Sequence, residues 1–222
     1  MLPTDIADLV YDPVAHATTC GGQPVPHVTE ILAATGLTTD FEALAARGGR
    51  IAEMLAHARA RGTAVHADCH AYDDDDLDWA KVDPRIAPFV HAWAACRTAL
   101  GLRPIAHARE RQVFHPFEWY TGIQDGVFID YAGVVVLGDI KTGDPEDAAA
   151  HLQTAAYAGA WDLAHPESRI QRRVAIWLVP QRRIPYRVID YSAWPDAHEH
   201  LPVFLAAKCV YNNQPGRRRR TA

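Results

Sequence analysis

Residues 134–141 read Val-Val-Val-Leu-Gly-Asp-Ile-Lys, and this stretch decides the fold. Its β-branched start predicts a buried strand. Alternate side chains of a strand share one face, so we expect Asp139 and Lys141 to point the same way and Ile140 to point into the core. A carboxylate beside an ammonium at the end of a buried strand forms either a structural ion pair or a reactive pair. In a reactive pair, the carboxylate would bind a metal ion while the lysine steadied an attacking water or a phosphate.

The sequence on both sides of this strand predicts a sheet. A helix that is rich in alanine and free of proline is expected to connect the first three strands to the last two. The expected strands cover residues 105–114, 120–131, 134–141, 174–179 and 186–189, and the helix covers 146–164. This order predicts an α/β or α+β fold, with a mixed β-sheet core flanked by helices.

The residues before this sheet predict an N-terminal helical extension. Helices are expected over 28–37, 41–61 and 84–100, with Gly62 interrupting the second before a further helical stretch that carries His66. We therefore expect a single domain over 1–222. Its parts are an irregular N-terminal segment (1–27), a helical part (28–104), a sheet-and-helix core (105–190) and a basic, disordered tail (212–222).

Composition limits the class of protein. The chain has 222 residues, of which 49% are hydrophobic and 22% charged, which suffices for one sizeable core. Its four cysteines lack paired spacing, which indicates reduced thiols. The first residues lack the basic and apolar regions of a signal peptide, and every apolar run is shorter than a membrane span. These features predict a soluble cytoplasmic protein that does not associate with membranes.

The net charge of −5 hides a strong asymmetry along the chain. Residues 1–100 hold 7 basic and 14 acidic side chains, whereas residues 168–222 hold 11 basic and 3 acidic ones. The overall value argues against a partner rich in phosphate, but the basic end is typical of proteins that bind a polyanion. Solvated loops and tails are the alternative explanation for both charge runs.

Further polar residues are expected to gather around Asp139. Asp125 ends Tyr120-Thr-Gly-Ile-Gln-Asp125 on the preceding strand, and neighbouring strands lie about 5 Å apart. Two facing carboxylates repel each other unless a proton or a cation separates them, and oxygen ligands favour Mg²⁺ or Mn²⁺. Glu110 could add a third carboxylate from one strand earlier, or it could be an exposed glutamate on the strand face.

Two polar residues mark the helix that follows the strand of Lys141. Gln153 and Tyr157 are four residues apart and therefore share one helix face. An amide and a phenol on one stripe of an alanine-rich helix suit hydrogen bonding to phosphate oxygens or to the lysine. They could instead be two half-buried polar residues at the surface of the domain.

Taken together, these motifs resemble those of the PD-(D/E)XK nuclease superfamily, and most closely the RecB-type and Cas4-type exonucleases with their phage relatives. The matching motifs are Gly122-x-x-Asp125, Asp139-x-Lys141, Gln153-x-x-x-Tyr157, Gly62-Thr-Ala-Val-His66 and Val28-Thr-Glu-Ile-Leu32. The resemblance covers about residues 28–190. It implies a restriction-endonuclease-like αβββαβ core and a Mg²⁺- or Mn²⁺-dependent deoxyribonuclease, most plausibly an exonuclease of phage-type recombination, replication or repair.

The resemblance also implies a role for each matching residue. The metal would be bound by the Asp125 and Asp139 carboxylates, by the backbone carbonyl of Ile140 and by His66. Glu110 would be a supporting ligand or a ligand of a second metal.

The remaining matching residues would act on the water and on the substrate. Lys141 would orient or help to deprotonate the attacking water and stabilise charge in the transition state. Gln153 and Tyr157 would hold the helix and the DNA backbone near the site. DNA is the implied partner, a recombination or single-strand-annealing protein is a possible second one, and an oligomer is possible.

Several alternatives stay open. Gln124 stands where the superfamily name has a proline. Some relatives hold an iron–sulfur cluster with a group of late cysteines, but only Cys209 lies late in this chain, so no cluster is expected. The grouping His66-x-x-Cys69-His70 would suit zinc but lacks a second ligand pair. The same fold also serves endonucleases and junction resolvases, and a DNA-binding or scaffold protein could retain it without cutting.

Overall fold

The protein is built on a five-stranded mixed sheet, seen in a computed structural model that describes residues 8–12, 17–143 and 149–215. The strands follow chain order across the sheet, and all neighbours are antiparallel except the third and fourth, which are parallel. They are β4 (Arg103–His115), β5 (Tyr120–Ile129), β6 (Val135–Lys141), β7 (Arg172–Leu178) and β8 (Tyr186–Asp190). Helix α5 (Ala150–Ala164) connects the two parallel strands. The mixed sheet, the order of strands and helix along the chain and the connecting helix are thus as the sequence predicts.

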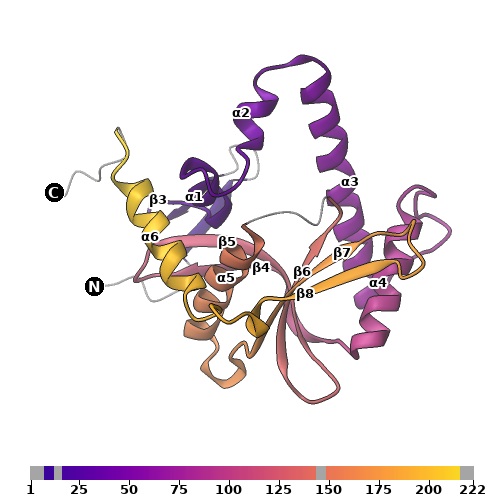
Figure 1. The fold of residues 1–222 in the computed structure, drawn as a ribbon. Coiled ribbons are helices and arrows are strands. Elements are labelled where there is room, and N and C mark those ends of the chain that lie inside the picture. The colour runs from indigo at the N-terminus through magenta and orange to yellow at the C-terminus, as the bar shows by residue number, and fades with distance from the viewer. Residues whose placement is uncertain (1–7, 13–16, 144–148, 216–222) are drawn as a thin grey trace.

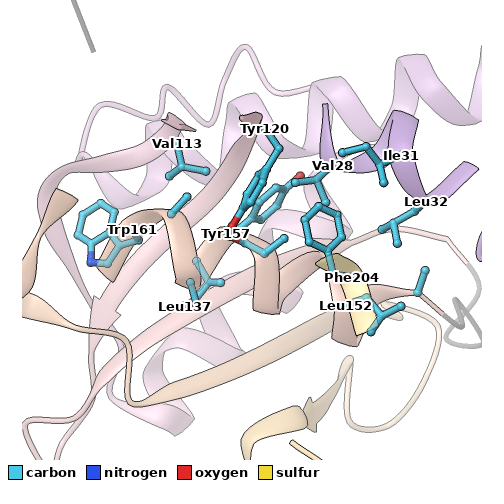
Figure 2. Packing of buried hydrophobic residues seen from close by; sticks show 14 of the residues in the cluster. Val28, Ile31, Leu32, Val113, Tyr120, Leu137, Leu152, Tyr157, Trp161 and Phe204 are labelled. Atoms are coloured by element: carbon cyan, nitrogen blue, oxygen red, sulfur yellow. Dashed lines mark hydrogen bonds between the residues drawn. The ribbon is translucent and has the colours of Figure 1, made fainter. Parts of the chain in front are cut away.

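Helices cover both faces of the sheet (Figure 1). One face packs against α3 (Gly49–Asp73) and α4 (Ala87–Leu100), and its buried residues include Phe128, Ile140 and Ile176. The opposite face packs against α5, α1 (Val28–Ala34) and α6 (His200–Asn212). Figure 2 shows this second core, in which Tyr120 and Leu137 of the sheet lie among side chains from all three helices.

The break in the N-terminal helices lies elsewhere than predicted. The sequence predicts one helix over 41–61 that Gly62 ends. The structure instead has a short α2 (Phe41–Ala45) and a long α3 that continues through Gly62. The break falls at Gly48 and Gly49, whose φ values of 72° and 65° favour glycine. A glycine inside a helix costs only about 1 kcal/mol relative to alanine, so tertiary packing can override it.

Residues 1–27 are not irregular throughout, which corrects a second prediction. The described residues of this segment form a small antiparallel sheet of β1 (Leu9–Asp12), β2 (Ala17–Cys20) and β3 (Gln23–Val25). The glycines Gly21 and Gly22, both with positive φ, turn the chain between β2 and β3. Cys20 and Val25 of this sheet pack on Phe114 of β4.

Helix α6 is not predicted from the sequence, although its buried residues complete the core on the α5 face. The predicted basic tail falls largely on residues 216–222, which lie outside the described residues, as do residues 146–148 of the predicted helix over 146–164. No helix in the described ranges combines the length and the apolar character needed to cross a bilayer. Cys20, Cys69 and Cys96 are buried free thiols, and Cys209 is an exposed one.

Candidate active site

Three acidic residues occupy neighbouring backbone positions on β4, β5 and β6. Gly126 pairs with Gly138, so the next residues outward along the two strands, Asp125 and Asp139, lie opposite each other. In the same way, Arg109 and Arg111 pair with residues 126 and 124, which places Glu110 opposite Asp125. The backbone register therefore brings the three acidic residues to adjacent positions, as the sequence predicts.

Asp139 and Lys141 form the predicted pair on the α5 face of the sheet. The Lys141 Nζ lies 2.9 Å from Asp139 Oδ2 and donates a hydrogen bond to Gln153 Oε1 at 3.1 Å. The Gln153 amide in turn donates to the Tyr157 hydroxyl at 3.0 Å. Residue 140 points to the opposite core, as predicted. These residues form one continuous chain of polar contacts.

Gly122 makes room for Tyr157, the last residue in this series of polar contacts. A Cβ at residue 122 would lie 2.4 Å from Cε1 of Tyr157, so only glycine lets the ring of Tyr157 lie directly on β5. Burial raises the pKa of Tyr157, which keeps its hydroxyl protonated. The ring is therefore a fixed support for Gln153, and Gln153 holds the lysine.

Asp125 is positioned by contacts with helix α3 and with the backbone of β6. Its Oδ1 lies 3.3 Å from His66 Nδ1, and its Oδ2 accepts a hydrogen bond from the backbone N–H of Ile140 at 2.6 Å. His66 reaches the site from the middle of α3. The close approach of α3 to the end of β6 occurs at Gly62, where an added Cβ would lie 3.6 Å from Thr142 Oγ1.

The buried charges divide the two aspartates. Burial by itself raises the pKa of Asp125, but the charge of His66 and its hydrogen bond, with the charge of Lys141, outweigh burial and lower it. Burial alone would lower the pKa of His66, and Asp125 raises it to about 9. Asp139 differs, because burial and the nearby Asp125 raise its pKa to about 6 against the attraction of Lys141. Asp125 is thus charged at neutral pH, whereas the charged form of Asp139 is destabilised by burial and by the nearby Asp125.

Glu110 does not join this group directly. Its backbone has a φ of +40°, just after the irregularity of β4 between Pro104 and Arg109. Its side chain is 54% exposed and lies 3.2 Å from His70 Nδ1 rather than at Asp125. His66 and His70 are one helical turn apart, with ring centroids 6.2 Å apart. A role for Glu110 as a metal ligand therefore stays a prediction. His70, which the sequence analysis includes only in the alternative zinc grouping, is a neighbour of the site.

The site opens into a large cleft. The cleft has a volume of about 1580 Å³, and Asp125, Asp139, Lys141, Gln153 and Tyr157 all line it. Its opposite wall comes from α1, α2 and the small N-terminal sheet. A cleft of this size holds more than a typical small-molecule ligand, for which about 300–1000 Å³ suffices.

The residues present suit a hard divalent cation in part. The Asp139 Oδ2 is buried and has no well-aligned hydrogen bond in the described residues, and the two aspartates repel each other across adjacent strands. A cation between them would remove that repulsion, and oxygen ligands of this kind favour Mg²⁺ or Mn²⁺. Across residues 8–12, 17–143 and 149–215, however, no three His, Cys, Asp or Glu side chains already converge on one point. The Asp125 and Asp139 carboxylates therefore suit the ion, and the roles of His66 and Glu110 as further ligands stay predictions.

The alternative zinc grouping is not assembled. Cys69 is buried in the apolar core between the sheet and α3, whereas His66 and His70 face the carboxylates. The sequence spacing of these three residues therefore does not correspond to one ligand set within the described structure.

Comparisons with known proteins add nothing to this geometry. No protein-family model matches the chain, and no curated protein matches its sequence.

Proposed function

We propose that the chain is a divalent-metal-dependent deoxyribonuclease. The observation that carries the proposal is the row of contacts from Asp125 and Asp139 through Lys141 to Gln153, placed along one large cleft. Paired buried carboxylates with a neighbouring lysine suit the hydrolysis of a phosphodiester, in which charge develops on phosphate oxygens.

Each of these residues has a role in the proposed reaction. Asp125, Asp139 and His66 would hold Mg²⁺ or Mn²⁺, with the Ile140 carbonyl as a further ligand. When bound, the metal would supply Lewis-acid chemistry, polarising the phosphate and lowering the pKa of water. Lys141, held by its hydrogen bond to Gln153, would place a positive charge beside the reacting phosphate and orient the attacking water.

The finer form of the proposal is an exonuclease of phage-type recombination, replication or repair that works in the cytoplasm. It rests on the motif resemblance, as does a partner that anneals single strands. An endonuclease or junction resolvase would use the same residues on circular DNA, and a non-cleaving protein would bind DNA without hydrolysis.

Linear and circular DNA substrates titrated with Mg²⁺ and Mn²⁺ test the proposal. Degradation of linear DNA alone supports the exonuclease, and nicking of circles supports the endonuclease. Asp139→Asn and Lys141→Ala should abolish cleavage, whereas the matched surface variants Asp83→Asn and Lys81→Ala should cut at the wild-type rate. DNA binding without any metal-dependent cleavage would show that the enzyme proposal is wrong.

A further inference from the structure

Three exposed arginines lie on the β7–β8 hairpin, outside the residues assigned above. Arg182 and Arg183 occupy its turn, and Arg187 lies on β8. Within the part of the chain that the structure describes, none of the three forms an ion pair with a carboxylate, unlike Arg172 and Arg97, which do. Three cations in one short hairpin, with no carboxylate partner among the described residues, form a strongly positive surface.

The sheet register places this hairpin beside the candidate site. Lys141 at the end of β6 pairs with Trp177 of β7, and Trp177 pairs with Arg187 of β8. Strands are spaced by about 4.8 Å, so the backbone of Arg187 lies about 10 Å from that of Lys141. Because paired residues on neighbouring strands share a face, the side chains of Lys141 and Arg187 project from the same face of the sheet. The parallel β6–β7 pairing also directs the hairpin turn to the edge of the sheet where β6 ends.

A fourth arginine lies at the same edge. Arg61 of α3 donates from its Nη2 to the carbonyl of Thr142 at 3.2 Å, directly after β6. The end of β6 is therefore flanked by Arg61 on one side and, across β7, by the arginines of the hairpin.

The far wall of the cleft carries the opposite charge. Glu30 of α1 and Asp40 and Glu42 at α2 line it, and the arginine that lines the cleft, Arg59, comes from α3. A phosphate chain would be repelled from this wall and attracted toward the hairpin. The charge distribution of the described residues is thus one-sided across the candidate site.

We infer that the β7–β8 hairpin is the anchoring surface for the DNA backbone, with Arg182, Arg183 and Arg187 contacting phosphates next to the one at Lys141. This inference rests on the proposed function, because it assigns a path to the substrate of that site. Guanidinium groups suit the role, since they remain charged and bind phosphate oxygens in a bidentate manner. Such contacts give affinity that depends on salt and not on base sequence.

The salt dependence of binding tests the inference. DNA affinity is measured in EDTA, where the proposed reaction does not proceed, by fluorescence anisotropy from about 50 to about 300 mM salt. The test variant is Arg182→Ala/Arg183→Ala. Each phosphate contact contributes about 0.7–0.9 to the slope of log K against log salt, so the variant should lose roughly 1.4–1.8. A fourfold rise in salt should then cost the wild-type protein about tenfold more affinity than the variant.

The matched control removes two arginines at the opposite edge of the sheet. Arg103 begins β4 and Arg169 precedes β7, so Arg103→Ala/Arg169→Ala changes the net charge equally without touching the hairpin. The inference is supported if only the hairpin variant lowers the slope. It is overturned if both double variants lower the slope alike, or if neither does.

Cleavage by the wild-type protein with Mn²⁺ is scored separately. If the wild-type protein binds and cuts DNA but the hairpin variant keeps the full slope, the anchoring surface is wrong while the nuclease proposal stands. If the wild-type protein cuts DNA with Mn²⁺ but does not bind it in EDTA, the anchoring surface is wrong, and if it neither binds nor cuts, both proposals are wrong.

Discussion

Replacing Asp139 with asparagine should stabilise the protein at neutral pH when no metal is present. Asp139 is buried, and burial together with the neighbouring Asp125 raises its pKa from 3.8 to about 6. When the pKa of a carboxyl group is higher in the folded than in the unfolded state, ionisation of that group lowers the free energy of unfolding. Stability is therefore lost as the pH rises from about 4 to about 6, and asparagine avoids this loss.

The size of the effect follows from the pKa difference. Each pKa unit corresponds to about 1.4 kcal/mol, so the rise from 3.8 to about 6 corresponds to about 3 kcal/mol above pH 6. This figure already includes the attraction of Lys141, which opposes the rise. Below pH 4 the carboxyl is neutral in both states, so the substitution should have little effect there.

Urea unfolding in EDTA at about pH 4 and about pH 8 measures both values. The exposed Asp83, paired with Arg85, provides the control, because Asp83→Asn should show no gain in stability at pH 8. Mg²⁺ or Mn²⁺ at about 100 times its dissociation constant should then stabilise the wild-type protein by about 2.7 kcal/mol and the Asp139 variant by much less. A loss of stability at pH 8 in EDTA, or an equal change at both pH values, would refute the reasoning.

Three further predictions follow from the contacts around the site. Gly122→Ala should cost about 1–3 kcal/mol in urea unfolding, because its Cβ would lie 2.4 Å from the Tyr157 ring, whereas Gly143→Ala, with open space around it, should be neutral. Gln153→Ala should slow DNA cleavage about 10- to 100-fold at saturating DNA with an unchanged dissociation constant, because it frees the site lysine; a parallel loss of binding would contradict this. Glu42→Gln should tighten DNA binding in anisotropy measurements, because it removes a negative charge from the cleft wall, and weaker binding would show that the DNA takes another path.

The sequence predicted the part of the fold that local patterns determine. The run of apolar residues before Asp139 specifies a buried strand, and the two-residue period of a strand fixes which side chains share a face. The four-residue spacing of Gln153 and Tyr157 predicts that they share one helix face, and in the structure they do. These features depend on neighbours in the chain, and they are confirmed.

Features that depend on distant contacts could not be predicted in the same way. The backbone irregularity at Glu110 turns its side chain toward His70, although the register places the residue opposite Asp125. Gly62 reads as a helix break, but packing of α3 against the end of β6 keeps the helix intact. Helix α6 begins with a proline in its first turn and holds few charges, so its sequence alone does not indicate where it packs.

The docking of α6 on α1 has a consequence for how the protein is made. Tyr211 hydrogen-bonds to Glu30, and Gln214 donates to the carbonyl of Ala34 at 2.7 Å, across about 180 residues of sequence. The helix that forms one wall of the cleft therefore lacks its support until α6 has left the ribosome. A nascent chain can assemble the carboxylates and the lysine on the sheet before α6 is made, but its cleft is completed only after α6 has docked on α1.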